Sequence, residues 1–116
     1  MVARSRPSNA DLDLLFRALA DTTRRDIVAR LATAPASVST LAARYDMSFA
    51  AVQKHVAVLE EAGLVTKKPH GRERIVSGNP ARLARARTLL VQLEGLWHSR
   101  MSQLDAVLAE PSHYQE

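Results

Sequence analysis

The chain has 116 residues, a formal net charge of +4 and no cysteine. That length suits one domain that buries about two-thirds of its unfolded surface, and the lack of cysteine excludes disulfides, thiolate metal sites and cysteine catalysis. No window approaches the roughly 18 consecutive apolar residues of a membrane span, so we expect a cytoplasmic protein without a membrane partner, whose basic excess favours a polyanion.

Residues 9–20 have the pattern of a first helix. Four apolar residues recur at helical spacing and would face the core: Leu12, Leu15, Phe16 and Leu19. Asp11 and Asp13 lie early in this helix, where the helix dipole favours anions. Only five residues of the chain are aromatic, so the core is predicted to consist largely of Leu, Val and Ala.

A second helix is predicted to follow Asp21 or Thr22, because either side chain can cap free backbone N–H groups. Its apolar residues again repeat at helical spacing: Ile27, Val28 and Leu31. The pattern continues to Pro35, which ends a helix because proline has no backbone N–H and its ring clashes with the preceding turn.

Residues 37–62 have the order of a helix-turn-helix. Ser37 can cap a short third helix that runs through Tyr45, and Asp46 suits the left-handed position of the turn that follows. Ser48 can then cap a fourth helix. The inner side of that helix would carry residues spaced by four and three: Val52, Val56, Leu59 and the terminating Gly63.

The outer side of the fourth helix is unusual for a solvated surface. A solvated side normally carries several Glu, Lys and Arg residues. This side instead holds Ala50, Gln53, Lys54 and Ala57. Small residues with one amide and one cation would let the helix approach another surface closely.

After the fourth helix the sequence period changes to that of strands. Residues 64–68 and 74–77 read as two strands joined by a Pro-His-Gly tip at residues 69–71. A β-hairpin directly after a helix-turn-helix is a wing, and this order is much rarer than the helix pair alone. We therefore predict a mostly α winged helix-turn-helix with about five helices and a small β-hairpin.

A long fifth helix is predicted from Asn79, as its cap, and Pro80 to about Ala109. At 1.5 Å per residue it would be roughly 45 Å long, against about 35 Å for a compact globule of this size. Part of its apolar stripe would lack a partner within the chain, and a twofold dimer covers such a stripe most simply. The alternative is a helix that breaks at Gly95 and folds back.

The dimer interface is expected to combine the fifth helix with the first. Its predicted residues are Leu12, Phe16, Leu90, Leu93, Trp97, Met101, Leu104 and Leu108. The expected organisation is a flexible arm at residues 1–8, a winged helix-turn-helix domain at residues 9–110 that includes a dimerisation helix at residues 79–110, and a flexible tail at residues 111–116.

Two stretches of the chain are similar to a known family. The chain resembles the ArsR-type winged-helix repressors over residues 11 to about 78, in LFRALADTTRRDIVARL and in SVSTLAARYDMSFAAVQKHVAVLEEAGLV, followed by the hairpin. The most specific pieces are Ala18-Leu19-Ala20-Asp21 with Thr23-Arg24, and the run VQKHVAVLEEAGLV. The resemblance implies a homodimeric prokaryotic transcription regulator whose fourth helix reads DNA.

The sequence departs from the metal-sensing members of that family. Those members carry a Cys-Val-Cys motif at the start of the third helix, where this chain has Ser37, Val38 and Ser39. A hydroxyl is a poor ligand for soft metals. On the last helix, three scattered polar residues share a face: Glu94, His98 and Asp105. We therefore predict neither a metal nor a cofactor.

The outer side of the fourth helix fits the edges of base pairs. In a helix-turn-helix protein the N-terminal part of the second helix enters the major groove. Gln53 can bond the N6 and N7 atoms of adenine, Lys54 can reach guanine or a phosphate, and an apolar side chain can meet a thymine methyl group. The predicted base-reading residues are Ser48, Phe49, Ala50, Gln53 and Lys54.

Three alternatives stay open for this helix. Phe49 flanks its inner side, so a core contact is as compatible with its position as a base contact. His55 also flanks that side and can equally be a packed, hydrogen-bonded residue. Gln53 and Lys54 can be ordinary solvated residues, although the neighbouring wing favours a role in binding.

Basic side chains crowd the predicted hairpin: Lys67, Lys68, His70, Arg72 and Arg74. We expect these residues to lie along the phosphate backbone or in the minor groove. The alternative is an edge strand that is charged to prevent aggregation, which is a common use of lysine. Both uses are compatible with one another.

The function that we predict is sequence-specific binding of double-stranded DNA by a homodimeric repressor at a palindromic operator. The alternative is a winged-helix module that binds a protein and not DNA. No glycine-rich phosphate loop, nucleophile elbow or pair of carboxylates indicates an enzyme. An unidentified small-molecule effector is a further expected partner, but no residue cluster in the sequence selects its chemistry.

Overall fold

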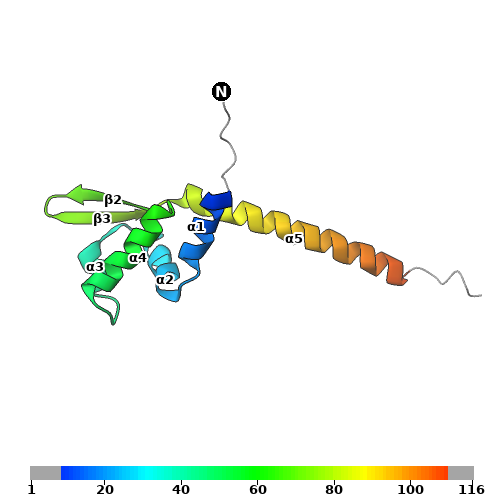
Figure 1. Cartoon of the computed structure of the whole chain (residues 1–116), viewed down its shortest axis with the longest axis horizontal. Helices are drawn as coiled ribbons and strands as arrows, with labels where there is room; N and C mark the ends of the chain where they lie inside the picture. The colour runs from blue at the N-terminus through cyan, green and yellow to red at the C-terminus, as the bar shows by residue number, and fades with distance from the viewer. Residues whose placement is uncertain (1–8, 110–116) are drawn as a thin grey trace, which may run out of the picture. The chain divides into compact units, whose positions relative to one another are not determined.

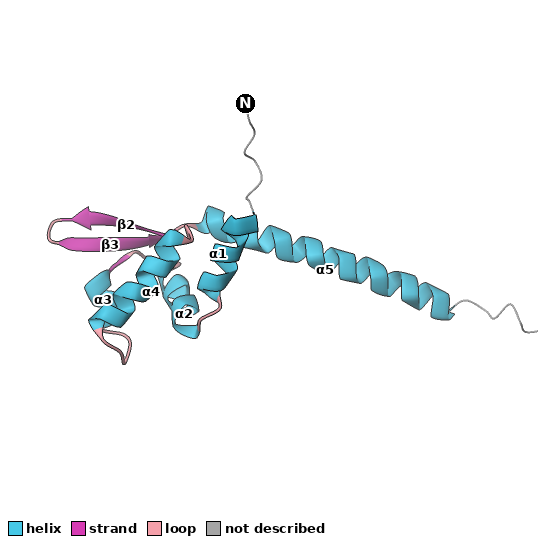
Figure 2. Ribbon diagram, viewed as in Figure 1, coloured by secondary structure: helices cyan, strands magenta, loops and turns pink. Residues whose placement is uncertain are grey.

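The computed structural model describes residues 9–109. In this range it contains five helices and a three-stranded antiparallel sheet (Figures 1 and 2). The elements in chain order are α1 (Asn9–Leu19), α2 (Thr22–Leu31), β1 (Ala36–Ser37), α3 (Val38–Ala42), α4 (Phe49–Glu61), β2 (Val65–His70), β3 (Glu73–Gly78) and α5 (Pro80–Ala109). The predicted winged helix-turn-helix class is confirmed. The predicted flexible ends, residues 1–8 and 111–116, lie outside the described residues, as does residue 110.

The chain divides after Ala86 into a winged-helix unit, residues 9–86, and a C-terminal helical segment, residues 87–109. One apolar core holds the winged-helix unit together. Its buried residues come from all five helices, from β2 and β3 and from the α4–β2 turn: Leu15, Ala18, Ile27, Leu31, Val38, Leu41, Val52, Val56, Leu59, Ala62, Leu64, Val65, Val76 and Ala86. Leu, Val and Ala predominate, as the composition predicts, and the aromatic rings of Phe16 and Tyr45 pack against the edge of this core.

Short polar side chains begin three of the helices, as predicted. The side chains of Asp21, Ser37 and Ser48 each accept a hydrogen bond, at 3.0 Å, from the backbone N–H three residues ahead. Each bond satisfies a donor that has no partner inside its helix. Asp21, rather than Thr22, is therefore the cap of α2.

Gly63 ends α4 in the left-handed conformation, with φ at +79°. The N–H of Gly63 donates to the Glu60 carbonyl, and the N–H of Leu64 donates to the Leu59 carbonyl, both at 2.9 Å. This pair of bonds is a Schellman motif, and the buried Leu59 and Leu64 provide the apolar contact that accompanies it. The chain thus turns directly from α4 into β2.

The sequence missed strand β1 and placed the end of α2 too late. α2 ends at Leu31 rather than at Pro35. Residues 36–37 pair in antiparallel register with β3, so the chain has to leave the helix before the proline. A strand of two residues carries too little pattern to be read from sequence.

The third helix is also shorter than predicted. α3 ends at Ala42 rather than at Tyr45. The N–H groups of Arg44 and Tyr45 donate to carbonyls three residues back, which tightens the chain out of the α-helix. The expected left-handed conformation of Asp46 is wrong, because only glycines have positive φ within residues 9–109.

The hairpin tip differs from the predicted one. Residues 65–70 pair with residues 73–78 along their whole length, which leaves a two-residue loop of Gly71 and Arg72 in place of the Pro-His-Gly tip. Gly71 has φ at +66° and Arg72 a negative φ, as in a type II′ turn. Pro69 is tolerated inside β2 because the strand order β1-β3-β2 makes β2 an edge strand.

The first turn of α5 is joined to the end of α4 by side chains. Arg82 Nε donates to the Ala62 carbonyl, and Asn79 Nδ2 donates to the Gly63 carbonyl, both at 2.9 Å. The guanidinium of Arg82 also lies 3.7 Å from the Asp11 carboxylate of α1. These contacts satisfy carbonyls that the end of a helix leaves without partners.

The C-terminal helical segment is a continuous helix through Gly95, so the alternative of a break at that residue is wrong. Large apolar side chains are exposed along it: Leu90, Val91, Leu93, Leu96, Trp97, Met101, Leu104, Val107 and Leu108. The two predicted interface residues of α1, Leu12 and Phe16, are half-buried in the winged-helix unit, and their place in a dimer interface stays a prediction.

Candidate nucleic-acid interface

The outer side of α4 is exposed to solvent, while its inner side is buried in the core. The exposed residues are Ala50, Gln53, Lys54 and Ala57. The fully buried residues are Val52, Val56 and Leu59. Because the two sets alternate at helical spacing, the core fixes α4 by one side and leaves the lightly decorated side open.

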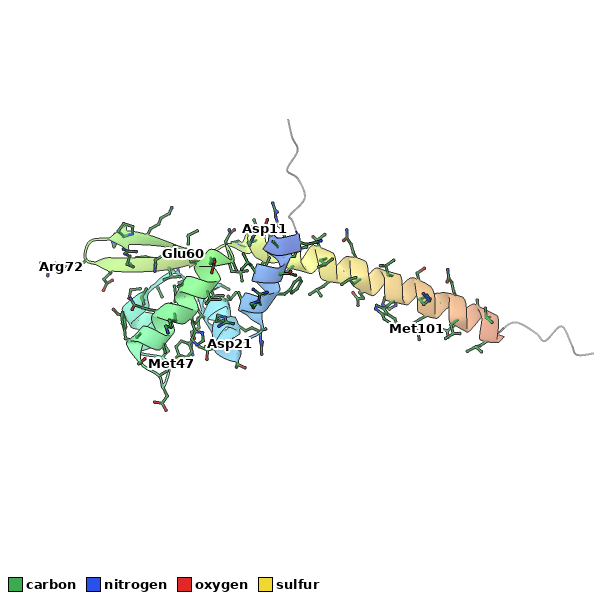
Figure 3. The ribbon with its side chains drawn as sticks, in the orientation of Figure 1. Asp11, Asp21, Met47, Glu60, Arg72 and Met101 are labelled. Atoms are coloured by element: carbon green, nitrogen blue, oxygen red, sulfur yellow. The ribbon has the colours of Figure 1, made fainter. Side chains whose placement is uncertain are left out.

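Phe49 and Met47 expose apolar surface at the N-terminal end of α4, with 47% and 36% of each residue accessible. The sequence left Phe49 open between a core contact and a surface role, and this exposure favours the surface role. Sequence reasoning missed Met47, which Figure 3 labels at the turn before α4. It also missed Arg44, an exposed cation in the same turn. Their only sequence signal is an apolar and a basic residue in a turn.

Polar contacts hold both edges of the inner side of α4. His55 is half-buried, and its Nδ1 lies 3.2 Å from Arg24 Nη1 of α2. Near the other end, the Glu60 carboxylate lies 3.8 Å from Lys67 Nζ of β2, and Figure 3 labels Glu60 near the base of the hairpin. His55 is thus the packed, hydrogen-bonded residue of the alternative interpretation.

Strand alternation divides the basic residues of the hairpin between two faces. Lys67 pairs in register with Val76 and Lys68 with Ile75, so the two lysines point to opposite faces. Val76 is buried, and Lys67 on the same face is half-buried beside Glu60. Four of the five predicted wing residues are exposed: Lys68, His70, Arg72 and Arg74, with Arg72 at the tip (Figure 3).

A polar cluster joins the turn before α4 to α2. Tyr45 Oη donates to Asp26 Oδ2 at 2.6 Å, and Arg30 Nε donates to the same oxygen at 2.9 Å. The bond from Tyr45, and then that from Arg30, holds the pKa of Asp26 below its ordinary value. Burial, and then the bond to Asp26, raises the pKa of Tyr45. The charge of Asp26 thus contributes to the placement of the helix-turn-helix.

The positions that suggested metal sensing have other partners here. Ser37 is buried, and its Oγ accepts from the Thr40 N–H and donates to Thr40 Oγ1, at 3.0 and 2.9 Å. On α5, the His98 ring lies 3.9 Å from the Glu94 carboxylate. Within residues 9–109, no three His, Cys, Asp or Glu side chains are grouped so that they could hold a metal ion.

Comparisons with known proteins decide the family. A model described as a helix-turn-helix domain matches residues 19–68. The HTH-type transcriptional regulator Rv2034 of Mycobacterium tuberculosis is 42% identical over 85 residues, which are 73% of this chain and 77% of that protein. A crystal structure of an ArsR family transcriptional regulator matches with a TM-score of 0.75 and 33% identity, over 80% of this chain and 96% of that one. The chain belongs to the ArsR family.

A second solved structure also supports the assignment of this regulator to the ArsR family. It is an ArsR-like transcriptional regulator from Rhodococcus sp. RHA1, with a TM-score of 0.74, 33% identity and coverage of 89% of this chain and 96% of that one. The helix-turn-helix of this regulator is a DNA-binding domain, as its family implies. None of its helices within residues 9–109 combines the length and the apolar character that a membrane span requires.

Proposed function

We propose that this ArsR-family regulator is a cytoplasmic repressor that binds a palindromic operator in double-stranded DNA as a homodimer. The observation that carries the proposal is the exposed side of α4, which presents Ala50, Gln53 and Lys54 from a helix whose other side is fully buried. The proposal assigns the protein no catalytic activity, as is general for transcriptional regulators.

In this proposal the first turns of α4 enter the major groove. Ala50 is small enough to let the helix seat, while Gln53 and Lys54 supply the donors and acceptors that base edges require. Phe49 and Ser48 complete the predicted set, and both are exposed at the same end of the helix. The exposed Met47 extends the apolar surface available to a thymine methyl group.

The exposed cations of the wing would contact phosphates or the minor groove. The side chains of Lys68, Arg72 and Arg74 carry only donors, and on the wing we assign these donors to phosphate oxygens, whose contacts carry no sequence information. Lys67 is a weaker candidate, because its ammonium already lies beside the Glu60 carboxylate. The aggregation-preventing role of the edge strand remains compatible with these contacts.

The exposed stripe of α5 supports the homodimer. Its apolar residues are spaced by three, four, four and three about Trp97: Leu90, Leu93, Trp97, Met101 and Leu104. In an antiparallel pair related by a twofold axis at Trp97, residues equally far from Trp97 face one another. Leu93 would then meet the partner's Met101, and Leu90 the partner's Leu104, so apolar residues cover apolar residues along the stripe.

Selection from a pool of random duplexes with the purified full chain tests the proposal. We expect enrichment of a palindrome whose half-sites are about one helical turn apart. A promoter that carries the selected site should lose reporter expression when the protein is made. Failure to enrich any sequence would contradict base reading, and enrichment of a single half-site would contradict the dimer.

A protein-binding module is the remaining functional alternative, and a triple variant separates the two. Lys68→Ala with Arg72→Ala and Arg74→Ala removes exposed wing cations and leaves the buried Val76 in place. A DNA-binding wing predicts that this variant loses affinity for random duplex DNA at low salt. Equal and weak binding by both proteins would favour the protein-binding module.

The proposal includes an unidentified small-molecule effector. The winged-helix unit offers room for one in an apolar groove of about 470 Å³ between α2 and the β3–α5 junction, lined by Arg25, Val28, Leu31, Leu64 and Leu83 among others. This volume lies in the range of small-ligand sites. Thermal unfolding against a fragment library, with Ala29→Trp as a groove-filling control, tests whether it binds a ligand.

A further inference from the structure

Arg24 joins three helices through one guanidinium group. Its Nε donates to the Ala18 carbonyl at 2.7 Å, and its Nη2 donates to the Arg17 carbonyl at 3.1 Å. Both carbonyls belong to the C-terminal end of α1, where backbone acceptors lack helical partners. The third contact runs from Nη1 to His55 Nδ1 of α4, at 3.2 Å.

The chemistry of this contact determines which ring nitrogen of His55 accepts the hydrogen bond. A guanidinium offers only donors and does not lose its proton in proteins, so Nδ1 of His55 has to be the acceptor. A hydrogen bond between these two atoms therefore requires the tautomer whose ring proton lies on Nε2. Asp21 Oδ2 lies 3.8 Å from the same Nδ1 and accepts from the Arg24 backbone N–H at 3.0 Å. The carboxylate thus caps α2 and orders the first turn of the helix that carries Arg24.

Asp21, Arg24 and His55 lie in the two most specific sequence runs of the chain. Asp21 and Arg24 belong to the run at residues 18–24, and His55 follows Lys54 in the run on α4. None of the three side chains belongs to the exposed outer side of α4, so DNA contact alone does not explain them. Their shared feature is the contact between the α1–α2 corner and the edge of α4, close to the labelled Asp21 (Figure 3).

We propose that Arg24 and His55 form a latch that sets the orientation of α4 relative to the α1–α2 corner. Both are positioning residues: they act through Gln53 and Lys54, which occupy the two positions before His55. The inference rests on the proposed function of α4 as the DNA-reading helix. The apolar core fixes which side of α4 is buried, and the latch would set the remaining small rotation of the helix, which shifts the side chains of Gln53 and Lys54 relative to the base edges.

Arg25 offers a matched control for Arg24. It is the next residue of α2, and its Nη1 donates to the Leu19 carbonyl at 2.8 Å. Both arginines therefore bind the end of α1. Of these two arginines, only Arg24 also has a hydrogen bond to α4 among the contacts of residues 9–109. Any effect of Arg24→Gln that Arg25→Gln lacks is due to the contact with His55 or with the two further carbonyls.

His55 allows a sharper pair of variants. His55→Asn places an amide oxygen near the position of Nδ1 and so keeps a hydrogen-bond acceptor there. His55→Leu keeps the apolar bulk but removes the acceptor. The readout is fluorescence anisotropy with the duplex that the wild-type protein selects and with a scrambled duplex of equal length. We expect Arg24→Gln and His55→Leu to lower affinity for the selected duplex about tenfold and to leave affinity for the scrambled duplex unchanged.

His55→Asn should retain wild-type affinity for both duplexes. Arg25→Gln should do so too when no effector is added, because Arg25 lines the proposed effector groove but does not contact α4. Equal weakening by His55→Asn and His55→Leu would overturn the proposal, because the acceptor would then be irrelevant. Equal weakening by Arg24→Gln and Arg25→Gln would overturn it too, since the effect would belong to the end of α1. Should Arg24→Gln fail to fold, the two His55 variants still decide.

The ring tautomer gives a readout that needs no DNA. In the wild-type protein, long-range ¹H–¹⁵N NMR should show His55 with its proton on Nε2 and a bare Nδ1. A proton on Nδ1 at neutral pH would overturn the latch. If Arg24→Gln shifts the Nδ1 resonance of His55 but the wild-type chain selects no duplex, the contact exists and the proposed DNA-reading function fails instead.

Discussion

At the residue scale, the proposed recognition depends on a difference in hydrogen-bonding chemistry between two surfaces. Gln53 lies on the outer side of α4, where its amide can match a base edge, whereas Lys68 lies on the wing, where we assign its donors to phosphate oxygens. Both side chains are exposed and neither is paired with a carboxylate in the described contacts, unlike Lys67. The two residues should therefore contribute to different quantities, specificity and overall affinity.

Gln53→Ala should weaken binding to the selected operator by about 1–3 kcal/mol and leave binding to an unrelated duplex unchanged. Lys68→Ala, the matched wing variant, should weaken binding to both duplexes by the same factor, because a phosphate contact carries no sequence information. Titration by fluorescence anisotropy measures both. A base-reading role for Gln53 is wrong if its variant lowers both affinities equally.

Asp26 gives a prediction about stability and pH. Its pKa in the folded protein lies below the ordinary value of 3.8, chiefly because Tyr45 donates to it. The unfolded chain therefore takes up this proton first as the pH falls, so the stabilisation is full above pH 3.8 and is lost as the pH drops through the folded pKa. Asp26→Asn should therefore have a lower free energy of unfolding than the wild type at pH 7, and this difference in free energy should decrease below pH 3.8.

Urea unfolding at pH 7, 5 and 3 measures this difference in free energy of unfolding. Tyr45→Phe is combined with Asp26→Asn in a double-mutant cycle. Since both substitutions remove the same hydrogen bond, the double variant should lose less stability than the two single losses added together. Additive losses, or a gap that stays constant to pH 3, would contradict the role assigned to the Asp26 charge.

At the element scale, capping motifs determine where α4 begins and where it ends. The Ser48 cap starts it, and the Schellman motif at Gly63 turns the chain into β2. Both signals were readable because each depends on a residue type that few others can replace. The ends of α2 and α3 were misplaced because pairing with β3 and short-range turn bonds, rather than capping residues, determine them.

Gly63→Ala should destabilise the protein by about 2 kcal/mol. Alanine is strained at φ +79°, and its Cβ would lie 2.9 Å from Arg82 Nε, whose bond to the Ala62 carbonyl would have to yield. Gly71→Ala is the control, because φ there is +66° but nothing lies within 4 Å of the added carbon. Thermal or urea unfolding should show the smaller loss for Gly71→Ala; equal losses would mean that the Arg82 contact is unimportant.

At the scale of the whole molecule, the apolar stripe of α5 is the basis of the proposed homodimer. Trp97 is 69% accessible in the single chain, and the large apolar side chains of the stripe on either side of it are exposed as well. Such a surface is costly in water unless it is covered. A dimer would also present α4 and the wing twice, which doubles the number of phosphates that one complex neutralises.

Leu93→Asp should convert the dimer to a monomer at micromolar concentration, whereas Val91→Asp, an exposed residue off the stripe, should not. Analytical ultracentrifugation measures this, and Trp97 fluorescence should shift to the red in the monomer. If each protomer neutralises three to five phosphates, the wild-type log–log salt slope should be about −5 to −9, and that of the monomer about half. A monomeric wild type or a flat salt dependence would contradict the dimer model.

Local patterns in the sequence determined the helices, the wing and the buried and exposed sides of α4. Periodic apolar residues, capping side chains and Gly63 act within a few positions of one another, so their effects can be read without knowing the rest of the fold. The same locality explains why Ala50, Gln53 and Lys54 were placed on an exposed side correctly. Whether those residues bind DNA stays a prediction.

Contacts between segments that are distant in the chain were decided only by the tertiary structure. Strand β1 pairs residues up to 40 positions apart, and the Arg24 contact with His55 joins residues 31 positions apart, and no local spacing encodes them. A side chain such as His55 can serve a base, the core or a neighbouring helix with the same chemistry. Only the packing of α1, α2 and α4 around one core selects its partner, because that packing brings the arginine within reach.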